Sequence, residues 1–201
     1  MSTLILASAS PQRKTLLEGL GLAFTVCPSA AEESLCTETD PVCRATVLAR
    51  MKAEDVRVRH PDAWVLGCDT LVVSSSGTLL EKPVDAEDAR RMLRLQSASA
   101  STVHSTLCLL SPEGESFEGI SSSTVHFTTL ADEQIEWWIS TGEWKDRSGS
   151  FQIDGKGQLM IEKLEGDWSG VVGLPVFLLG DLFFQVGFSI QDFGKVDIFA
   201  G

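Results

Sequence analysis

The chain has 201 residues, of which 43% are hydrophobic and 22% are charged, and its formal net charge is −12. This length can bury a sizeable core as one domain or as two close-packed lobes. The negative charge excludes a general binder of nucleic acids or of anionic membranes, because its field repels polyanions. A local cationic pocket in such a chain would select a small anion, together with a divalent metal.

The cysteines and the apolar segments indicate the compartment. Five cysteines form no C-x-x-C pair and no zinc-type spacing, so we expect reduced thiols in a cytoplasmic protein: Cys27, Cys36, Cys43, Cys68 and Cys108. The first residues lack the basic region and the long apolar core of a signal peptide. The most apolar stretch, 174–188, is interrupted by Asp181 and is too short to span a bilayer. We therefore expect a buried helix there and no membrane partner.

The first predicted elements meet at a turn around Ser10. An apolar run ahead of the turn predicts a buried strand, and Ser10 and Pro11 have the chemistry of a helix N-cap and first position. Backbone N–H groups at such a turn are unpaired and carry the positive end of the helix dipole. With Ser8 and Arg13 at the same point, the turn is either an ordinary capped helix or a phosphate cradle.

A second strand is expected at 22–27, followed by an acidic loop. A capped helix then begins at Asp40 and runs to about Arg59. Its apolar residues recur at three- and four-residue steps on one face: Val42, Ala45, Ala49 and Val56. Lys52 falls on that same face. A lysine there either snorkels to the edge or points into a polar cleft.

The strongest predicted strand, 63–73, carries polar residues only at its centre, Asp69 and Thr70. An ionised carboxylate in such a run is costly unless it is paired or bound to a metal. Gly67 lies on the same face and is expected to leave open space beside the carboxylate. We therefore favour a functional Asp69 over one that is only hydrogen-bonded to a neighbouring loop.

The rest of the chain predicts antiparallel strands and glycine-rich loops. Further elements are expected in this order: a strand at 78–80, a helix from Asp85 to Leu95, paired strands at 102–110 and 115–129, a helix at 131–141 and a strand at 159–164. The long loops 142–157 and 166–175 are expected to line a binding site. Early alternation of strands and helices with later antiparallel pairs indicates an α/β chain with a mixed sheet.

Charged residues of opposite sign recur along these elements. The cations are Arg13, Lys52 and Lys82, and the carboxylates are Asp69 and the pair Glu32-Glu33. Metal-assisted cleavage of a polyphosphate needs such a set, because carboxylates hold Mg²⁺ and orient a water while cations neutralise the phosphates. Each of these residues alone is weak evidence for such a site, but their order along one chain is specific.

That order resembles the Maf family of nucleoside triphosphate pyrophosphatases from residue 4 to about residue 185. The resemblance rests on these motifs: Ser8-Ala9-Ser10-Pro11-Gln12-Arg13, Glu33, Leu48-Ala49-Arg50-Met51-Lys52-Ala53, Gly67-Cys68-Asp69-Thr70, Glu81-Lys82-Pro83 and Val171-Val172-Gly173-Leu174-Pro175. It implies a fold like that of inosine triphosphate pyrophosphatase: a long twisted mixed α/β sheet with flanking helices and two lobes around a cleft. It also implies a single domain over 1–201 that forms a homodimer, with 189–201 as an extension of unknown role.

The resemblance further implies hydrolysis of a small-molecule nucleoside triphosphate to the monophosphate and pyrophosphate, with Mg²⁺ or Mn²⁺ as cofactor. By this resemblance Asp69 acts as base on water or through the metal, and Glu33 is a second carboxylate near the metal. The matched catalytic residues are Asp69, Glu33, Lys52 and Lys82. The matched substrate-binding residues are Ser8, Ser10, Gln12, Arg13, Thr70 and Asp154, and the matched phosphate-binding cations are Arg13, Lys52 and Lys82.

The nucleotide base is left open by a mixed signature. Thr70 and Ile153 favour dTTP or UTP, with house-cleaning of the nucleotide pool as the cellular role. Asp154 stands where the pyrimidine-specific branch carries Gln, and an acidic residue there, with Ser150-Phe151, resembles the branch acting on 7-methyl-GTP. Gln12 replaces the arginine that the family usually carries. The alternatives are therefore a 7-methyl-GTP pyrophosphatase and a nucleotide-binding regulator of cell division with little turnover.

Overall fold

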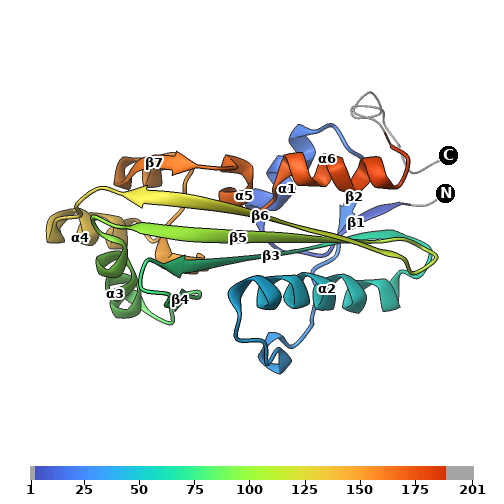
Figure 1. Ribbon diagram of the computed structural model, residues 1–201, viewed down its shortest axis with the longest axis horizontal. Helices are drawn as coiled ribbons and strands as arrows, with labels where there is room; N and C mark the ends of the chain where they lie inside the picture. The colour runs from blue at the N-terminus through green and yellow to red at the C-terminus, as the bar shows by residue number, and fades with distance from the viewer. Residues whose placement is uncertain (1–2, 189–201) are drawn as a thin grey trace. The chain divides into compact units, whose positions relative to one another are not determined.

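The computed structural model describes residues 3–188, and its strands form a mixed sheet (Figure 1). The strand order is β2-β1-β3-β5-β6-β7, and β4 pairs with β3 beside that path. Strand β1 is parallel to β2 and β3, whereas β4 is antiparallel to β3 and β7 is antiparallel to β6. The strand bounds are β1 Leu4–Leu6, β2 Phe24–Val26, β3 Trp64–Ser74, β4 Leu79–Leu80, β5 Ala100–Leu110, β6 Ser116–Phe127 and β7 Ile161–Glu165.

The first three long helices begin at the caps that the sequence predicts. Ser10, Asp40 and Asp85 each accept a hydrogen bond from the backbone N–H three residues further on. The helix bounds are α1 Pro11–Gly19, α2 Pro41–Arg59, α3 Ala86–Gln96, α4 Asp132–Thr141, α5 Trp168–Val172 and α6 Val176–Gln185. None of the helices within residues 3–188 has the length and hydropathy to cross a membrane. The predicted α/β fold with a mixed sheet and flanking helices is confirmed.

Segments that were expected to be loops contain short helices. The 3-10 turn η1 (Glu33–Leu35) interrupts the acidic loop, η2 (Ser148–Ser150) lies within 142–157, and α5 lies within 166–175. Turn η3 (Gly155–Met160) begins in the loop 142–157 and runs into the strand expected at 159–164, which starts only at Ile161. Such turns are too short to display a hydrophobic period, so a reading of the pattern misses them. The predicted C-terminal extension, 189–201, lies outside the described residues.

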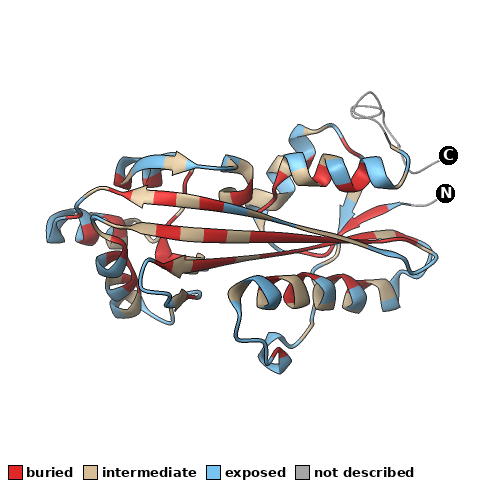
Figure 2. Cartoon of the chain, viewed as in Figure 1, coloured by how far each residue is buried: buried red, intermediate tan, exposed pale blue. Residues whose placement is uncertain are grey.

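The described chain clusters into two compact units, and the first consists of residues 3–69, 105–121 and 173–188. Leu4 and Leu6 of β1 pack in one apolar cluster with α1 and α6, whereas Ile5 packs in another with α2. Figure 1 shows α2 on one side of β1, and α1 and α6 on the other side. Because helices cover both faces, every residue of β1 is buried (Figure 2).

The second unit consists of residues 70–104 and 122–172. Helices α3 and α4 pack around Trp138, which is fully buried and donates its indole N–H to the carbonyl of Ser150 at 2.8 Å. The rings of Phe127 and Phe151 meet edge to face with centroids 4.9 Å apart. This core therefore holds Ser150 through its carbonyl and Phe151 through its ring. Trp137 is 39% exposed, so only one member of the tryptophan pair belongs to the core.

Candidate functional site

At the N-terminus of α1, serine hydroxyls and backbone groups bind one another. The hydroxyl oxygen of Ser10 accepts from the N–H of Arg13 at 3.4 Å and donates to Oε1 of Gln12 at 3.3 Å. The N–H of Ser10 donates to Oγ of Ser8 at 3.2 Å. The turn thus places Ser8, Ser10 and Gln12 together at the positive end of the α1 dipole.

The guanidinium of Arg13 is held by acceptors from three parts of the first unit. Its Nη1 donates to Oγ of Ser8 and to the carbonyl of Cys68, both at 3.1 Å, and its Nε donates to the carbonyl of Gly173 at 2.8 Å. Two of these acceptors are backbone carbonyls, which fix the orientation of the guanidinium. Since Cys68 precedes Asp69 on β3, Arg13 reaches the strand that carries the predicted catalytic carboxylate.

Lys52 points at carboxylates and does not snorkel to solvent. Its Nζ lies 2.6 Å from Oδ1 of Asp69 and 3.0 Å from Oε1 of Glu33. The side chain of Asp69 is 7% exposed, that of Lys52 14%, and that of Glu33 49%. Helix α2, strand β3 and turn η1 therefore bring three predicted catalytic residues into contact. Asp69 is therefore paired through one oxygen, one of the two arrangements that make a buried carboxylate tolerable.

The second carboxylate oxygen of Asp69 is the unusual atom of this group. Oδ2 is buried and has no hydrogen-bond partner within residues 3–188. A buried anionic oxygen without a partner is costly, which marks a position prepared for a bound ligand. Among the described residues no group of three or more His, Cys, Asp or Glu could hold a metal. Mg²⁺ commonly takes only one or two carboxylates and completes its shell with waters and substrate phosphates, so Asp69 and Glu33 fit such an ion.

Gly67 has a different role from the one its position on β3 suggested. A Cβ on Gly67 would lie 2.1 Å from the carbonyl oxygen of Ala49 and 2.9 Å from Cβ of Ala53. The expectation of open space beside Asp69 is therefore wrong, because the backbone of α2 fills it. The glycine allows α2 to approach β3 closely, and this approach brings Lys52 to Asp69.

Burial and charge act against each other on the thiol beside the site. Burial raises the pKa of Cys68 to about 11, although the nearby charges of Arg13 and Lys52 lower it. Burial likewise raises the pKa of Cys108 to about 12. All five cysteines are free thiols. Cys68 is therefore protonated at neutral pH and is unsuited to act as a nucleophile or a metal ligand.

Three predicted site residues belong to the second unit. Thr70 accepts through its carbonyl from the hydroxyl of Ser148 at 3.2 Å, and the carbonyl of Glu81 accepts from the N–H of Gly149 at the same distance. Turn η2 therefore ties the β3 segment at Thr70 to the segment that carries Lys82. Lys82 is exposed, and Asp154 is partly buried at the start of η3. In the part of the chain that the structure describes, neither side chain forms a hydrogen bond or ion pair.

The loop that carries Asp154 is clamped by a carboxylate that the sequence did not single out. Oε2 of Glu143 accepts from Nε2 of Gln152 at 3.1 Å, and Oε1 pairs with Nζ of Lys156 at 2.6 Å. A Cβ on Gly157 would meet the carbonyl oxygen of Gln152 at 1.9 Å, so the loop doubles back on itself there. No local sequence pattern predicts these contacts, since a glutamate near polar residues is ordinary in a sequence.

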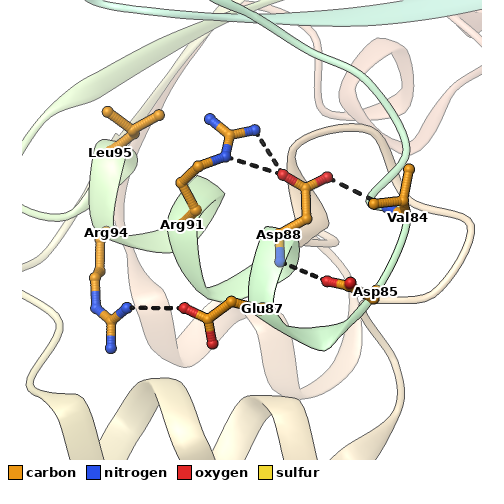
Figure 3. Close-up of a pocket in the computed structure, with 7 residues that line it drawn as sticks. All are labelled: Val84, Asp85, Glu87, Asp88, Arg91, Arg94 and Leu95. Carbon is orange, nitrogen blue, oxygen red and sulfur yellow. Dashed lines mark hydrogen bonds and ion pairs between the residues drawn. The ribbon is translucent and has the colours of Figure 1, made fainter.

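A hollow of about 670 Å³ on α3 contains none of the predicted site residues (Figure 3). Its cations are already paired: Arg91 binds Oδ1 of Asp88 at 2.7 Å, and Arg94 lies 3.8 Å from Glu87. Figure 3 shows these side chains directed at one another along the helix surface. The hollow is therefore a poor site for a polyphosphate, because its arginines are neutralised in place.

Comparisons with known proteins find a family and named relatives that match most of the chain. The sequence profile of the family described as "Maf-like protein" matches residues 3–186. A protein of Deinococcus radiodurans named dTTP/UTP pyrophosphatase is 42% identical over 176 residues, which are 87% of this chain and 88% of that protein. A protein of Treponema denticola with the same name is 40% identical over 202 residues, covering 94% of this chain and 100% of its own.

A solved structure of a HAM1 protein from Coxiella burnetii is similar with a TM-score of 0.44 and 14% sequence identity. It covers 63% of this chain and 73% of its own.

Proposed function

The chain belongs to the Maf family, and we propose that it hydrolyses a nucleoside triphosphate to the nucleoside monophosphate and pyrophosphate. The preferred substrates are dTTP and UTP. Support comes from relatives of 42% and 40% identity that align over most of the chain and are named dTTP/UTP pyrophosphatase. In this reaction a water attacks the α-phosphorus, the bond from that phosphorus to the bridging oxygen breaks, and pyrophosphate leaves.

The observation that carries the proposal is the buried, unpartnered Oδ2 of Asp69. Its partner oxygen is held at 2.6 Å by Lys52, so the carboxylate is oriented and one oxygen remains to accept a proton. Asp69 accepts the proton of the attacking water at Oδ2, the role of a general base. Its burial keeps bulk water away from that oxygen.

By resemblance to the family, Arg13 and Lys82 are the cations proposed to bind the phosphates. The carbonyls of Gly173 and Cys68 orient the guanidinium of Arg13, and the N-terminus of α1 adds the positive end of a helix dipole beside Ser8 and Ser10. Lys82 has no partner in the described chain and is available to a phosphate oxygen. Fixed positive groups of this kind stabilise the charge that develops on a leaving pyrophosphate.

A divalent cation, Mg²⁺ or Mn²⁺, is the expected cofactor, and Asp69 and Glu33 are the residues that would hold it. When bound, such an ion neutralises phosphate charge and lowers the pKa of a bound water. The carboxylate oxygens of Asp69 and Glu33 suit a hard cation such as Mg²⁺ or Mn²⁺.

Thr70 and Asp154 are the candidates for recognition of the base, with Gln12 as a further contact. Uracil and thymine present one N–H donor at N3, which a carboxylate oxygen of Asp154 accepts. Guanine-type bases present two adjacent donors, which a carboxylate accepts through both oxygens, so a 7-methyl-GTP activity is the second candidate. The Asp154 side chain has no partner within residues 3–188, and this observation supports the second candidate.

We also propose that residues 1–201 act as a single catalytic domain and that the protein is a cytoplasmic homodimer, both by resemblance to the family. Light scattering of the purified protein measures the oligomeric state directly. A monomeric mass would contradict the dimer and leave the chemistry at Asp69 untouched.

The test is release of pyrophosphate from dTTP, UTP, CTP and 7-methyl-GTP with Mg²⁺ or Mn²⁺. We expect Asp69→Asn to lose activity by a factor of about 10² or more, because the base is removed while the shape is kept. Asp62→Asn, an exposed position after α2, is the matched control and should retain activity. Equal release by wild type and Asp69→Asn would refute the assigned role. Tight nucleotide binding without turnover in the wild type would instead favour a regulatory protein.

The preferred nucleotide base is determined by testing the variants Asp154→Gln and Gln12→Arg with the same panel of nucleotides. We expect Asp154→Gln to retain dTTP and UTP turnover, because an amide oxygen still accepts from N3–H. Activity on 7-methyl-GTP that exceeds activity on dTTP and UTP in the wild type would establish the second candidate.

A further inference from the structure

Lys52 occupies the position between the two carboxylates that are expected to hold the metal. Its Nζ contacts Oδ1 of Asp69 at 2.6 Å and Oε1 of Glu33 at 3.0 Å, so one ammonium bridges acceptors from β3 and η1. In this arrangement the single positive charge of the lysine offsets part of the negative charge of the two carboxylates. A lysine whose task was only to bind phosphate would not need a contact with both carboxylates.

A divalent cation on these same carboxylates would face the ammonium at close range. Like charges at such a separation repel strongly in a partly buried site, where solvent screens them less than at the surface. The side chain of Lys52 is 14% exposed and that of Asp69 is 7% exposed, so this screening is limited. The metal and the ammonium therefore compete for the two carboxylates.

We propose that Lys52 is an internal counter-cation that keeps the metal affinity of the nucleotide-free protein low. This inference rests on the proposed nucleotide pyrophosphatase function. A bound triphosphate offers the ammonium a more negative partner, so Lys52 transfers its contact to a phosphate and releases Asp69 and Glu33 to the cation. By linkage, nucleotide and metal then raise each other's affinity, and the site is completed only when both are present.

The test measures Mn²⁺ binding by calorimetry in the absence of any nucleotide. We expect Lys52→Gln and Lys52→Met to bind Mn²⁺ at least about tenfold more tightly than the wild type, within the usual range of coupling between two ligands. Lys52→Arg keeps the positive charge and should bind Mn²⁺ as weakly as the wild type. Lys14→Gln is the matched control, because Lys14 is an exposed lysine on α1 paired only with Glu18 and its loss should leave Mn²⁺ affinity unchanged.

A carboxylate variant distinguishes competition between Lys52 and the metal from a general effect of net charge on Mn²⁺ affinity. When Glu33→Gln is combined with Lys52→Gln, most of the gain in Mn²⁺ affinity should disappear, because the freed ligand is absent. Mn²⁺ binding by Lys52→Gln and Lys52→Met that is no tighter than in the wild type would overturn the inference. Equal gains in Lys52→Gln and Lys14→Gln would also overturn it.

Folding of each variant is checked by circular dichroism and thermal unfolding before titration. If neither neutral variant folds, the wild type still tests the inference through the ¹⁵N signal of the Lys52 ammonium. That signal should change when Mg²⁺ saturates the protein, and an unchanged signal would overturn the inference. None of these measurements uses turnover, so a failure of the proposed activity would appear only in the pyrophosphate assay.

Discussion

Substituting Gly67 by alanine tests whether the close approach of α2 to β3 builds the site. The added Cβ would lie 2.1 Å from the carbonyl oxygen of Ala49, well inside van der Waals contact, and 2.9 Å from Cβ of Ala53. Because the first obstacle is helix backbone and not the end of a flexible side chain, α2 must move. Over-packing of this kind costs about 1–3 kcal/mol, and we expect Gly67→Ala to lie at the upper end of that range.

Movement of α2 also separates Lys52 from Asp69, which are now in contact at 2.6 Å. We therefore expect Gly67→Ala to lose both stability and turnover. Urea unfolding measures the free energy of unfolding, and a loss of about 3 kcal/mol corresponds to a decrease in Tm of about 6–12 °C for a chain of this size. Pyrophosphate release, normalised to folded protein, measures the second effect.

Gly180→Ala is the matched control, because it makes the same change in α6 where a Cβ meets nothing within 4 Å. Alanine is the better helix former there, so this variant should gain about 0.5–1 kcal/mol and keep its activity. Wild-type stability and turnover in Gly67→Ala would refute the reasoning, because the clash would then relax without displacing α2.

Two further predictions concern charged contacts. A hydrogen bond from Arg50 holds the pKa of Glu118 below its usual 4.5, so this carboxylate adds stability above pH 4.5 that is lost as the pH falls through its lowered folded-state pKa. Since Arg50 is half exposed, Glu118→Gln should lower the free energy of unfolding by only about 0.5–1 kcal/mol at pH 7, and by progressively less in acid. Urea unfolding at pH 7 and in acid checks this, and an equal loss of stability under the two conditions would contradict it. Glu143→Ala should release Gln152 and Lys156, and steady-state kinetics should give a KM for the nucleotide raised about threefold to tenfold with a smaller change in kcat, as expected for the loss of two partly exposed hydrogen bonds. Glu133→Ala, exposed on α4, is its control, and a loss of kcat with unchanged KM would show that the clamp does not position the substrate.

The features of this protein that can be predicted from its sequence are those determined by residues close to one another in the chain. The caps at Ser10, Asp40 and Asp85 each involve an N–H only three residues away, so residue type alone predicts them. Strand β3 is readable because it is a long apolar run, and Asp69 stands out in it because an unpaired carboxylate is costly there. The type and order of charged groups indicate the cations and carboxylates of the candidate site, whereas Gln12, Thr70 and Asp154 are assigned to it by the family resemblance.

Contacts between distant parts of the chain were decided only by the tertiary structure. The sequence left Lys52 between two orientations, and the packing of α2 on β3 at Gly67 directs it to Asp69. Arg13 is oriented by a carbonyl 160 residues away, at Gly173, and the clamp at Glu143 leaves no local pattern. The sequence misleads at Gly67, because the absence of a side chain shows that space is needed there but does not show that the backbone of α2 occupies it. Propensity and capping act through neighbours in the chain, whereas the direction of a buried side chain depends on which backbone packs against it.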